Sequence, residues 1–283
     1  MALWKIALWK IIGCGLLAAT FLPHVAVAET PQVRMVPNQV FAERNNKILL
    51  ADIYLPPGEG PFPGVLMIHG GAWAGGSRSH MAAHALFLAN HGYVVASISY
   101  RFAPHSPFPA QLEDCQAGLD WLLKNADKFQ MDPRRLAAWG YSAGGHLASL
   151  LATTEANDAE VSPLKAVVAG GAPCDFTDEP AESERLKFFL GGSRAELPEV
   201  YAAASPVTHA TAKCPPMFFF HGTSDEIVPM ENSQVMYKKL SCLGVPTTYH
   251  KLEGLGHVGA FINLEARREA LKFLDDHLKL NPS

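Results

Sequence analysis

The sequence predicts an α/β fold in which a mostly parallel sheet of eight strands carries helices on both faces. From residue 64 onward, short apolar runs alternate with longer segments of helical periodicity, and this alternation is typical of strand–helix–strand units. Hydrophobic residues make up 48% of the 283 residues, enough for the core of one large domain or two small ones. After residue 28 no repeat or second domain boundary appears, so residues 29–283 are expected to form a single domain.

The first elements are two strands that are expected to pair antiparallel, near residues 33–42 and 48–55. The later apolar runs predict strands at 64–69, 93–100, 136–140, 166–170, 217–221 and 247–252. Helical periodicity predicts helices at 81–90, 112–125, 143–153, 230–243 and 267–278. Because parallel sheets bind ligands beyond the carboxyl ends of their strands, we expect functional residues in the loops that follow each strand.

Residues 1–28 have the pattern of a secretory signal peptide. Two lysines precede an apolar stretch at 11–22, and the small residues of "AVA" permit cleavage after Ala28. The stretch is too short for a stable membrane span, so the chain is expected to be secreted or periplasmic. The "IIGC" that ends at Cys14 resembles a lipoprotein attachment box, but Lys10 leaves almost no apolar segment before it, so lipidation is the weaker alternative.

A connection of about forty residues joins the strand that ends near Gly170 to the strand that begins at Met217. Helical patterns near 182–190 and 197–204 predict that this excursion, about 173–213, forms a small partial cap over the pocket. Its aromatic side chains either line an acyl or aryl pocket or pack the cap against the domain. They are Phe176, Phe188, Phe189 and Tyr201.

Four cysteines follow the signal peptide: Cys115, Cys174, Cys214 and Cys242. Four cysteines in a large domain do not make a disulfide scaffold. Cys214 precedes a predicted strand, and Cys242 ends the helix that returns antiparallel to it, so these two are the candidate pair for a disulfide. Four buried thiols are the alternative.

The segment "AAWGYSAGGHLAS", residues 137–149, places Ser142 between small residues where a predicted strand gives way to a predicted helix. So tight a turn strains its central residue, and Gly140 and Gly144 let the strand and the helix approach each other closely. The Ser142 hydroxyl would then stand at a helix N-terminus, which is the geometry of a nucleophile elbow. The alternative is that the glycines and the serine only cap the helix. The motif alone does not exclude this, because a serine hydroxyl acts as a nucleophile only when a base is present.

The segment "VLMIHGGAWAGG", residues 65–76, runs from a predicted strand into consecutive glycines. Gly70 and Gly71 have no side chain that would keep a substrate from their amides, so the loop can direct N–H donors at an oxyanion. Ala143, directly after the serine, adds a donor from the helix N-terminus. An ordinary glycine-rich turn is the alternative.

An acid and a base follow the last two strands. "FFFHGTSDEIVP" places Asp225 in the loop after one strand, and "LEGLGHVGAF" places His257 in a glycine-rich loop after the next. Neighbouring strand ends can bring a carboxylate to the far nitrogen of an imidazole that faces a serine, as a catalytic triad requires. Glu226 and Asp175 are alternative acids.

The other histidines have structural interpretations. His69 and His221 end strands and are expected to brace their loops, and His146 is expected to be a packed or hydrogen-bonded residue of its helix. His80 and His84 share the i, i+4 spacing of a zinc-binding helix but lack the glutamate between them, and no third ligand is evident. No metal site is therefore predicted.

These motifs resemble the α/β-hydrolase fold, and more narrowly the hormone-sensitive-lipase-like and feruloyl-esterase-like (BD-FAE-like) bacterial carboxylesterases. The resemblance covers nearly all of the chain after residue 28 and rests on "HGGAW", "YRFAPHSPFPAQLEDC", "GYSAGGHLA", "ASPVTH", "HGTSDEIVP" and "GLGHVGAF". It implies a nucleophile, a base and an orienting acid at Ser142, His257 and Asp225. It implies oxyanion donors at Gly70, Gly71 and Ala143. Ala72 stands where lipase relatives usually carry a third glycine, which favours the feruloyl- and acetyl-esterase side of the family.

The expected function is that of a serine carboxylesterase without a metal or organic cofactor. The serine attacks an ester carbonyl, the alcohol leaves, and water hydrolyses the acyl-enzyme. Expected substrates carry short-chain acyl, acetyl or feruloyl groups, on small molecules or on polysaccharide. A net charge of −4 argues against a nucleic-acid partner. The alternatives are a peptidase or an arylamide or formamide hydrolase on the same fold, and an inactive hydrolase that serves as a binding module.

Overall fold

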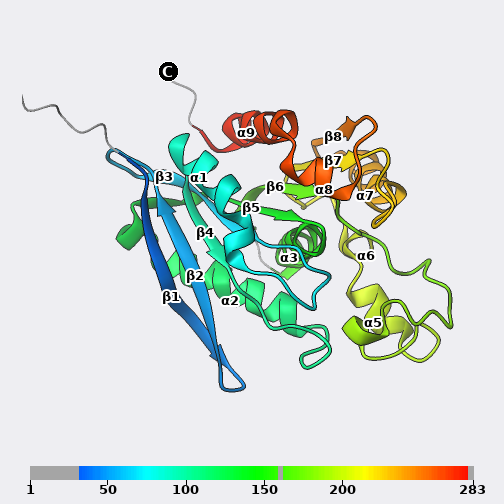
Figure 1. Ribbon diagram of the computed structural model, residues 1–283. Coiled ribbons are helices and arrows are strands. Elements are labelled where there is room, and N and C mark those ends of the chain that lie inside the picture. The colour runs from blue at the N-terminus through cyan, green and yellow to red at the C-terminus, as the bar shows by residue number, and fades with distance from the viewer. Residues whose placement is uncertain (1–31, 159–161, 280–283) are drawn as a thin grey trace, which may run out of the picture. The chain divides into compact units, whose positions relative to one another are not determined.

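The computed structural model describes residues 32–158 and 162–279, so the predicted signal peptide lies outside the described residues. Eight strands form one sheet in the order β1-β2-β4-β3-β5-β6-β7-β8 (Figure 1). They are β1 (Arg34–Arg44), β2 (Lys47–Leu55), β3 (Phe62–Ile68), β4 (Val94–Ile98), β5 (Met131–Tyr141), β6 (Leu164–Gly170), β7 (Met217–Gly222) and β8 (Thr247–Leu252). β2 pairs antiparallel with β1 and β4, and every other pairing is parallel. The predicted fold class is confirmed.

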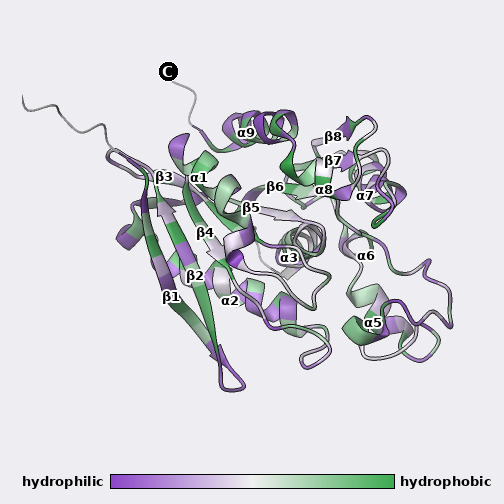
Figure 2. Cartoon of the chain, in the orientation of Figure 1, coloured by the Kyte–Doolittle hydropathy of each residue, from purple (hydrophilic) through white to green (hydrophobic). Residues whose placement is uncertain are grey.

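Helices cover both faces of the sheet. α1 (Ala82–Asn90) and α9 (Leu264–Leu278) pack on one face, and α2 (Ala110–Lys124), α3 (Ala143–Asp158) and α7 (Glu231–Cys242) pack on the other. The bands of alternating hydropathy along α9 in Figure 2 fit a helix that lies between core and solvent. Among residues 32–158 and 162–279, no helix combines the length and the apolar character that crossing a bilayer demands.

The side chains of β3 explain why its sequence is an uninterrupted apolar run. Val65 and Met67 belong to the core under α1 and α9, whereas Leu66 and Ile68 belong to the core on the opposite face. A parallel strand that is buried on both faces needs apolar residues at every position, because no position faces water.

The excursion between β6 and β7 contains three short helices, where the sequence predicted two. They are α4 (Lys187–Leu190), α5 (Pro198–Ala203) and α6 (Pro206–His209). The helix predicted at 182–190 is confined to its second half because the first half folds back on Glu179. Ser183 Oγ donates to that carboxylate at 2.6 Å, and Arg185 Nε donates to it at 2.9 Å.

The disulfide predicted between Cys214 and Cys242 is wrong, because both cysteines are free. The Cys214 thiol is buried and accepts a hydrogen bond from the Thr211 amide at 3.4 Å. Cys242, at the end of α7, is exposed, so the alternative of four buried thiols is also wrong. The rotation of α7 about its axis places Cys242 on the side of the helix that faces solvent, so its thiol does not face the strand that follows Cys214.

The parallel pairing of β3, β4, β5, β6, β7 and β8 brings their carboxyl ends to one edge of the sheet (Figure 1). Five loops and the excursion therefore start from that edge. The residues predicted to be functional follow β3, β5, β7 and β8, so a single site at this edge can contain them.

Candidate active site

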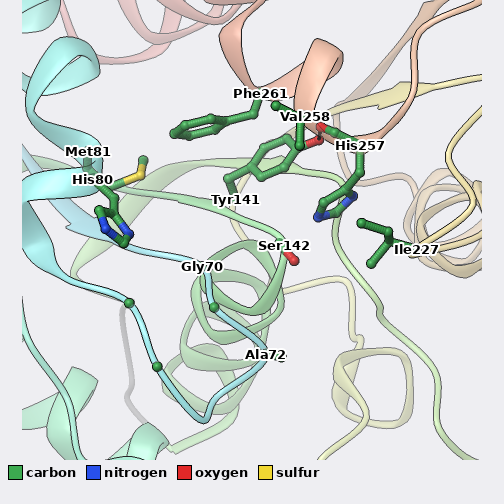
Figure 3. Close-up of a pocket in the computed structure, with 13 residues that line it drawn as sticks. Gly70, Ala72, His80, Met81, Tyr141, Ser142, Ile227, His257, Val258 and Phe261 are labelled. Carbon is green, nitrogen blue, oxygen red and sulfur yellow. Dashed lines mark hydrogen bonds between the residues drawn. The ribbon is translucent and has the colours of Figure 1, made fainter.

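Ser142 lies in a strained turn between β5 and α3. Its φ of 56° is in the left-handed region, which costs a non-glycine residue about 1–2 kcal/mol. A Cβ at Gly140 would overlap the carbonyl oxygen of Gly144, and a Cβ at Gly144 would overlap that of Ile68. The glycines therefore let the helix start directly against the strands, and the turn presents the serine hydroxyl to the cavity in Figure 3.

The loop after β3 is the second strained segment of the site. Gly71 has a φ of 124°, and Ala72 and Trp73 have φ values of 51° and 56°. The amides of Ala74 and Gly75 both donate to the Gly71 carbonyl, at 3.1 and 3.0 Å, which closes the loop into a tight turn. Gly70 lies so close to the elbow that a Cβ there would be 2.8 Å from the Tyr141 carbonyl oxygen. The backbone of the loop therefore lies directly against the serine turn.

Trp73 anchors this loop to the cap. Its ring stacks on Phe189 with ring centroids 4.1 Å apart, and its Nε1 donates to His146 Nδ1 at 3.1 Å. His146 Nε2 in turn donates to the Ala204 carbonyl at 2.7 Å. Burial lowers the pKa of His146 to about 4, so the ring is neutral and can accept at one nitrogen while it donates at the other. The expected packing role of His146 is confirmed.

We expect Trp73→Phe to lower kcat between about tenfold and 10²-fold. The aromatic ring stays, but the hydrogen bond from Trp73 Nε1 to His146, which holds the strained loop in place, is lost. The unpaired, buried His146 Nδ1 should also lower the free energy of unfolding by about 1–3 kcal/mol. Urea denaturation and ester hydrolysis measure the two effects. Trp121→Phe, on α2, is the matched control and should leave kcat unchanged. Equal kcat values for Trp73→Phe and wild type would show that the indole N–H does not position the loop.

Asp225 and His257 meet at the ends of β7 and β8. The His257 Nδ1 is 2.6 Å from Asp225 Oδ2, and the carboxylate is fully buried. The amides of Ile227 and Val228 donate to Asp225 Oδ1 at 3.0 and 2.9 Å. These bonds fix the carboxylate in the plane that faces the imidazole, and they leave Oδ2 for the histidine.

His221 contacts the same carboxylate, a contact that the sequence did not indicate. Its Nε2 is 3.2 Å from Asp225 Oδ2 and 2.8 Å from the Val228 carbonyl oxygen, while its Nδ1 is 2.7 Å from Ser233 Oγ. Burial lowers the pKa of His221 below its ordinary value, which favours the neutral ring. A neutral His221 that accepts from Ser233 donates from Nε2, so it supports both the acid and the loop that holds it.

The structure places Asp225 against His257 and leaves both alternative acids elsewhere. Glu226 is exposed. Asp175 accepts from the Thr177 amide at 2.8 Å and from its hydroxyl at 2.6 Å, which makes a local turn.

His257 begins a six-residue helix, α8 (His257–Ile262), where the sequence predicted a loop. Tyr141 lies beneath this helix, and its hydroxyl donates to the His257 carbonyl at 2.5 Å. The imidazole consequently points into the cavity, above the Ser142 hydroxyl (Figure 3).

Two cavities meet at Ser142. The larger, about 450 Å³, is lined by Gly70, Gly71, Tyr141, His257, Val258, Phe261 and neighbouring residues. The smaller, about 200 Å³, is lined by Trp73, Ala143, Phe176, Leu186, Phe188, Val228 and neighbouring residues. Both interpretations of the cap aromatics hold in part, since Phe176 and Phe188 line the smaller cavity, whereas Phe189 and Tyr201 are fully buried.

The two histidines with zinc-helix spacing do different things. His80, in the 3₁₀ turn η1 (Arg78–Met81), lines the larger cavity, and His84 is buried with its Nε2 3.2 Å from the Phe261 carbonyl oxygen. Within residues 32–158 and 162–279, no group of three His, Cys, Asp or Glu side chains is placed to hold a metal ion.

Comparisons with known proteins identify relatives of this chain. The BD-FAE family profile matches residues 51–240. Esterase LipC of Mycobacterium tuberculosis is 33% identical over 70% of this chain and 53% of its own length, so the chain spans about half of this curated relative.

Two solved structures share the fold. A truncated carbohydrate esterase from gut microbiota superposes with a TM-score of 0.80 at 22% identity, over 89% of this chain and 99% of that one. Esterase Est2 of Thermogutta terrifontis superposes with a TM-score of 0.72 at 26% identity, over 89% and 94%.

Proposed function

Because the chain belongs to the BD-FAE family of α/β-hydrolases, we propose that it is a serine carboxylesterase that hydrolyses esters of short acyl groups. Ser142 is the nucleophile, His257 the base and Asp225 the acid that orients the base. The observation that carries this proposal is the 2.6 Å contact between Asp225 and His257, beside a cavity that Ser142 and His257 both line.

The proposed reaction has two stages. His257 Nε2 takes the hydroxyl proton of Ser142 as Oγ bonds to the ester carbonyl carbon, and Asp225 holds the Nδ1–H and stabilises the imidazolium. The imidazolium then gives its proton to the departing alcohol oxygen, and a water molecule hydrolyses the acyl-enzyme by the reverse transfers. The amides of Gly70, Gly71 and Ala143 receive the oxyanion, at about 3 kcal/mol of transition-state stabilisation for each donor.

The two cavities separate the two halves of the ester. The departing alcohol must lie beside the imidazole that protonates it, and His257 lines the larger cavity. The acyl group therefore occupies the smaller cavity of about 200 Å³. Stacking between Trp73 and Phe189 makes its wall rigid, so acetyl to butyryl groups fit better than long chains or a feruloyl group.

Export is the remaining part of the proposal. It is supported by the signal-peptide pattern of residues 1–28. N-terminal sequencing of the exported protein should begin at Glu29, and a protein that keeps its first residues inside the cell would contradict export.

A serine-directed fluorophosphonate, together with a series of p-nitrophenyl esters, tests the proposal. We expect a single adduct on the peptide that contains Ser142, and hydrolysis should fall in proportion to labelling. Acetate and butyrate should be hydrolysed with kcat/KM values at least about tenfold above those of octanoate and ferulate, because the longer groups overfill the smaller cavity.

Two results would contradict the proposal in different ways. An adduct on another serine would reject the nucleophile. A preference for octanoate or ferulate, with the adduct on Ser142, would reject only the assignment of short acyl groups.

A further inference from the structure

We propose that the alcohol part of the substrate is an apolar chain or ring, and that it binds a hydrophobic surface leading from the larger cavity onto α8. This inference rests on the proposed function, because it takes the alcohol to leave on the His257 side of Ser142. It narrows the substrates to short-acyl esters of apolar alcohols and argues against sugar alcohols.

Apart from Ser142, His257 and His80, the side chains that line the larger cavity are apolar. Met81, Phe261, Val258 and Ile227 line it together with the ring of Tyr141 (Figure 3). The Tyr141 hydroxyl is already engaged with the His257 carbonyl, so it offers the cavity its ring. A sugar would need several convergent hydrogen-bonding groups here, whereas these side chains match a hydrocarbon.

The apolar lining continues onto the outer surface. Ile227 is 63% exposed, Val258 66% and Ile262 60%, high values for large aliphatic side chains. Val258 and Ile262 stand one helical turn apart on α8 and so share a face. Ile227 lines the same cavity as Val258 and lies on the other side of His257 from it (Figure 3). We call these three residues the α8 surface. Its continuity with the cavity that holds His257 identifies its occupant as the alcohol of the reacting ester.

Polar side chains gather on the other side of Ser142. A third cavity, of about 410 Å³, shares Arg185 and Asn232 with the smaller cavity and is lined by Asp175, Asp178, Glu179 and Glu231. The smaller cavity beside Ser142 is itself largely apolar, but beyond it the lining becomes charged and polar. On the side from which the alcohol departs, the apolar lining instead continues to the outer surface.

Acetate esters of increasing alcohol length test the inference, with methyl, butyl, hexyl and octyl acetate below their solubility limits and a xylose acetate as the polar member. The acyl group is constant, so only the alcohol side changes. We expect kcat/KM to rise with alcohol length, by up to about fourfold for each methylene that the surface buries, and to be lowest for the sugar ester.

Ile262→Ser provides the matching variant, because this residue lies on the α8 surface without lining the cavity. The ratio of kcat/KM for octyl acetate to that for methyl acetate should fall about fivefold, and Ile262→Leu should restore it. Ile48→Ser, at an equally exposed isoleucine of β2, is the control and should leave the ratio unchanged.

Several outcomes would overturn the inference. The first is a kcat/KM that does not change with alcohol length, and the second is a preference for the xylose ester. The third is a rate that rises only above the critical micelle concentration, and the fourth is a dimer in solution that Ile262→Ser dissociates. The third would mean adsorption to an aggregate, and the fourth an interface between copies. If no acetate is hydrolysed and Ser142 takes no fluorophosphonate, the proposed function itself fails.

Discussion

Replacement of Ser142 by alanine should lower kcat for p-nitrophenyl acetate by about 10⁶-fold, to the rate that oxyanion donors and binding alone provide. Alanine removes the only atom of this residue that can bond to the ester carbonyl carbon, and it leaves the turn and the helix start in place. The free energy of unfolding should stay within about 0.5 kcal/mol, because alanine occupies the left-handed conformation at a cost close to that of serine. Steady-state hydrolysis and urea denaturation of the same preparation check both values.

Ser241→Ala is the matched control for this variant. Ser241 is exposed near the end of α7, at the edge of the sheet opposite the candidate site, and its loss should leave kcat unchanged. A Ser142→Ala protein that keeps more than a hundredth of the wild-type kcat would sink the assignment of the nucleophile.

Asp225→Asn should lower kcat by about 10⁴-fold with little change in the fold. The amide oxygen can still accept from the Ile227 and Val228 amides, so the Nδ2 group faces His257 Nδ1. The imidazole must then accept at Nδ1 and carry its proton on Nε2, where it can no longer take the proton of Ser142. The acylation rate should fall more than KM changes, and stopped-flow measurement of the p-nitrophenol burst separates the two.

The neighbouring residue offers a control that also tests the rival acid. Glu226 is exposed, so Glu226→Gln should keep kcat within about twofold of wild type. The opposite pattern, a low kcat for Glu226→Gln and a wild-type kcat for Asp225→Asn, would show that Glu226 and not Asp225 is the acid.

The sequence predicted the sheet and the grouping of the candidate residues because both follow from local patterns. Apolar runs mark strands that are buried on both faces, and parallel pairing then fixes which loops share an edge. Ser142, Asp225 and His257 each follow a strand in the sequence, so no long-range information was needed to bring them to one edge.

Features that depend on side-chain direction or on distant contacts were not predictable in this way. Gly254, Gly256 and Gly259 suggested a loop around His257, yet the segment from His257 forms α8 because it packs on Tyr141. The exposure of Cys242 depends on helix phase. The hydrogen bonds of His146 connect it to Trp73, which is 73 positions away in the sequence, and to Ala204 of the cap, which is 58 positions away. Nothing in the local sequence indicates that these residues are partners.

Two residues of the loop after β7 contribute both to the position of Asp225 and to the walls of the cavities. The amides of Ile227 and Val228 grip the carboxylate of Asp225, while their side chains form walls of the cavities on either side of Ser142. A substitution that changes the size or shape of these side chains therefore also shifts the carboxylate of Asp225, which contacts His257. If the proposed function holds, a substitution in this loop that changes substrate range also changes turnover, whereas Phe188 of the cap lines the smaller cavity from a separate segment.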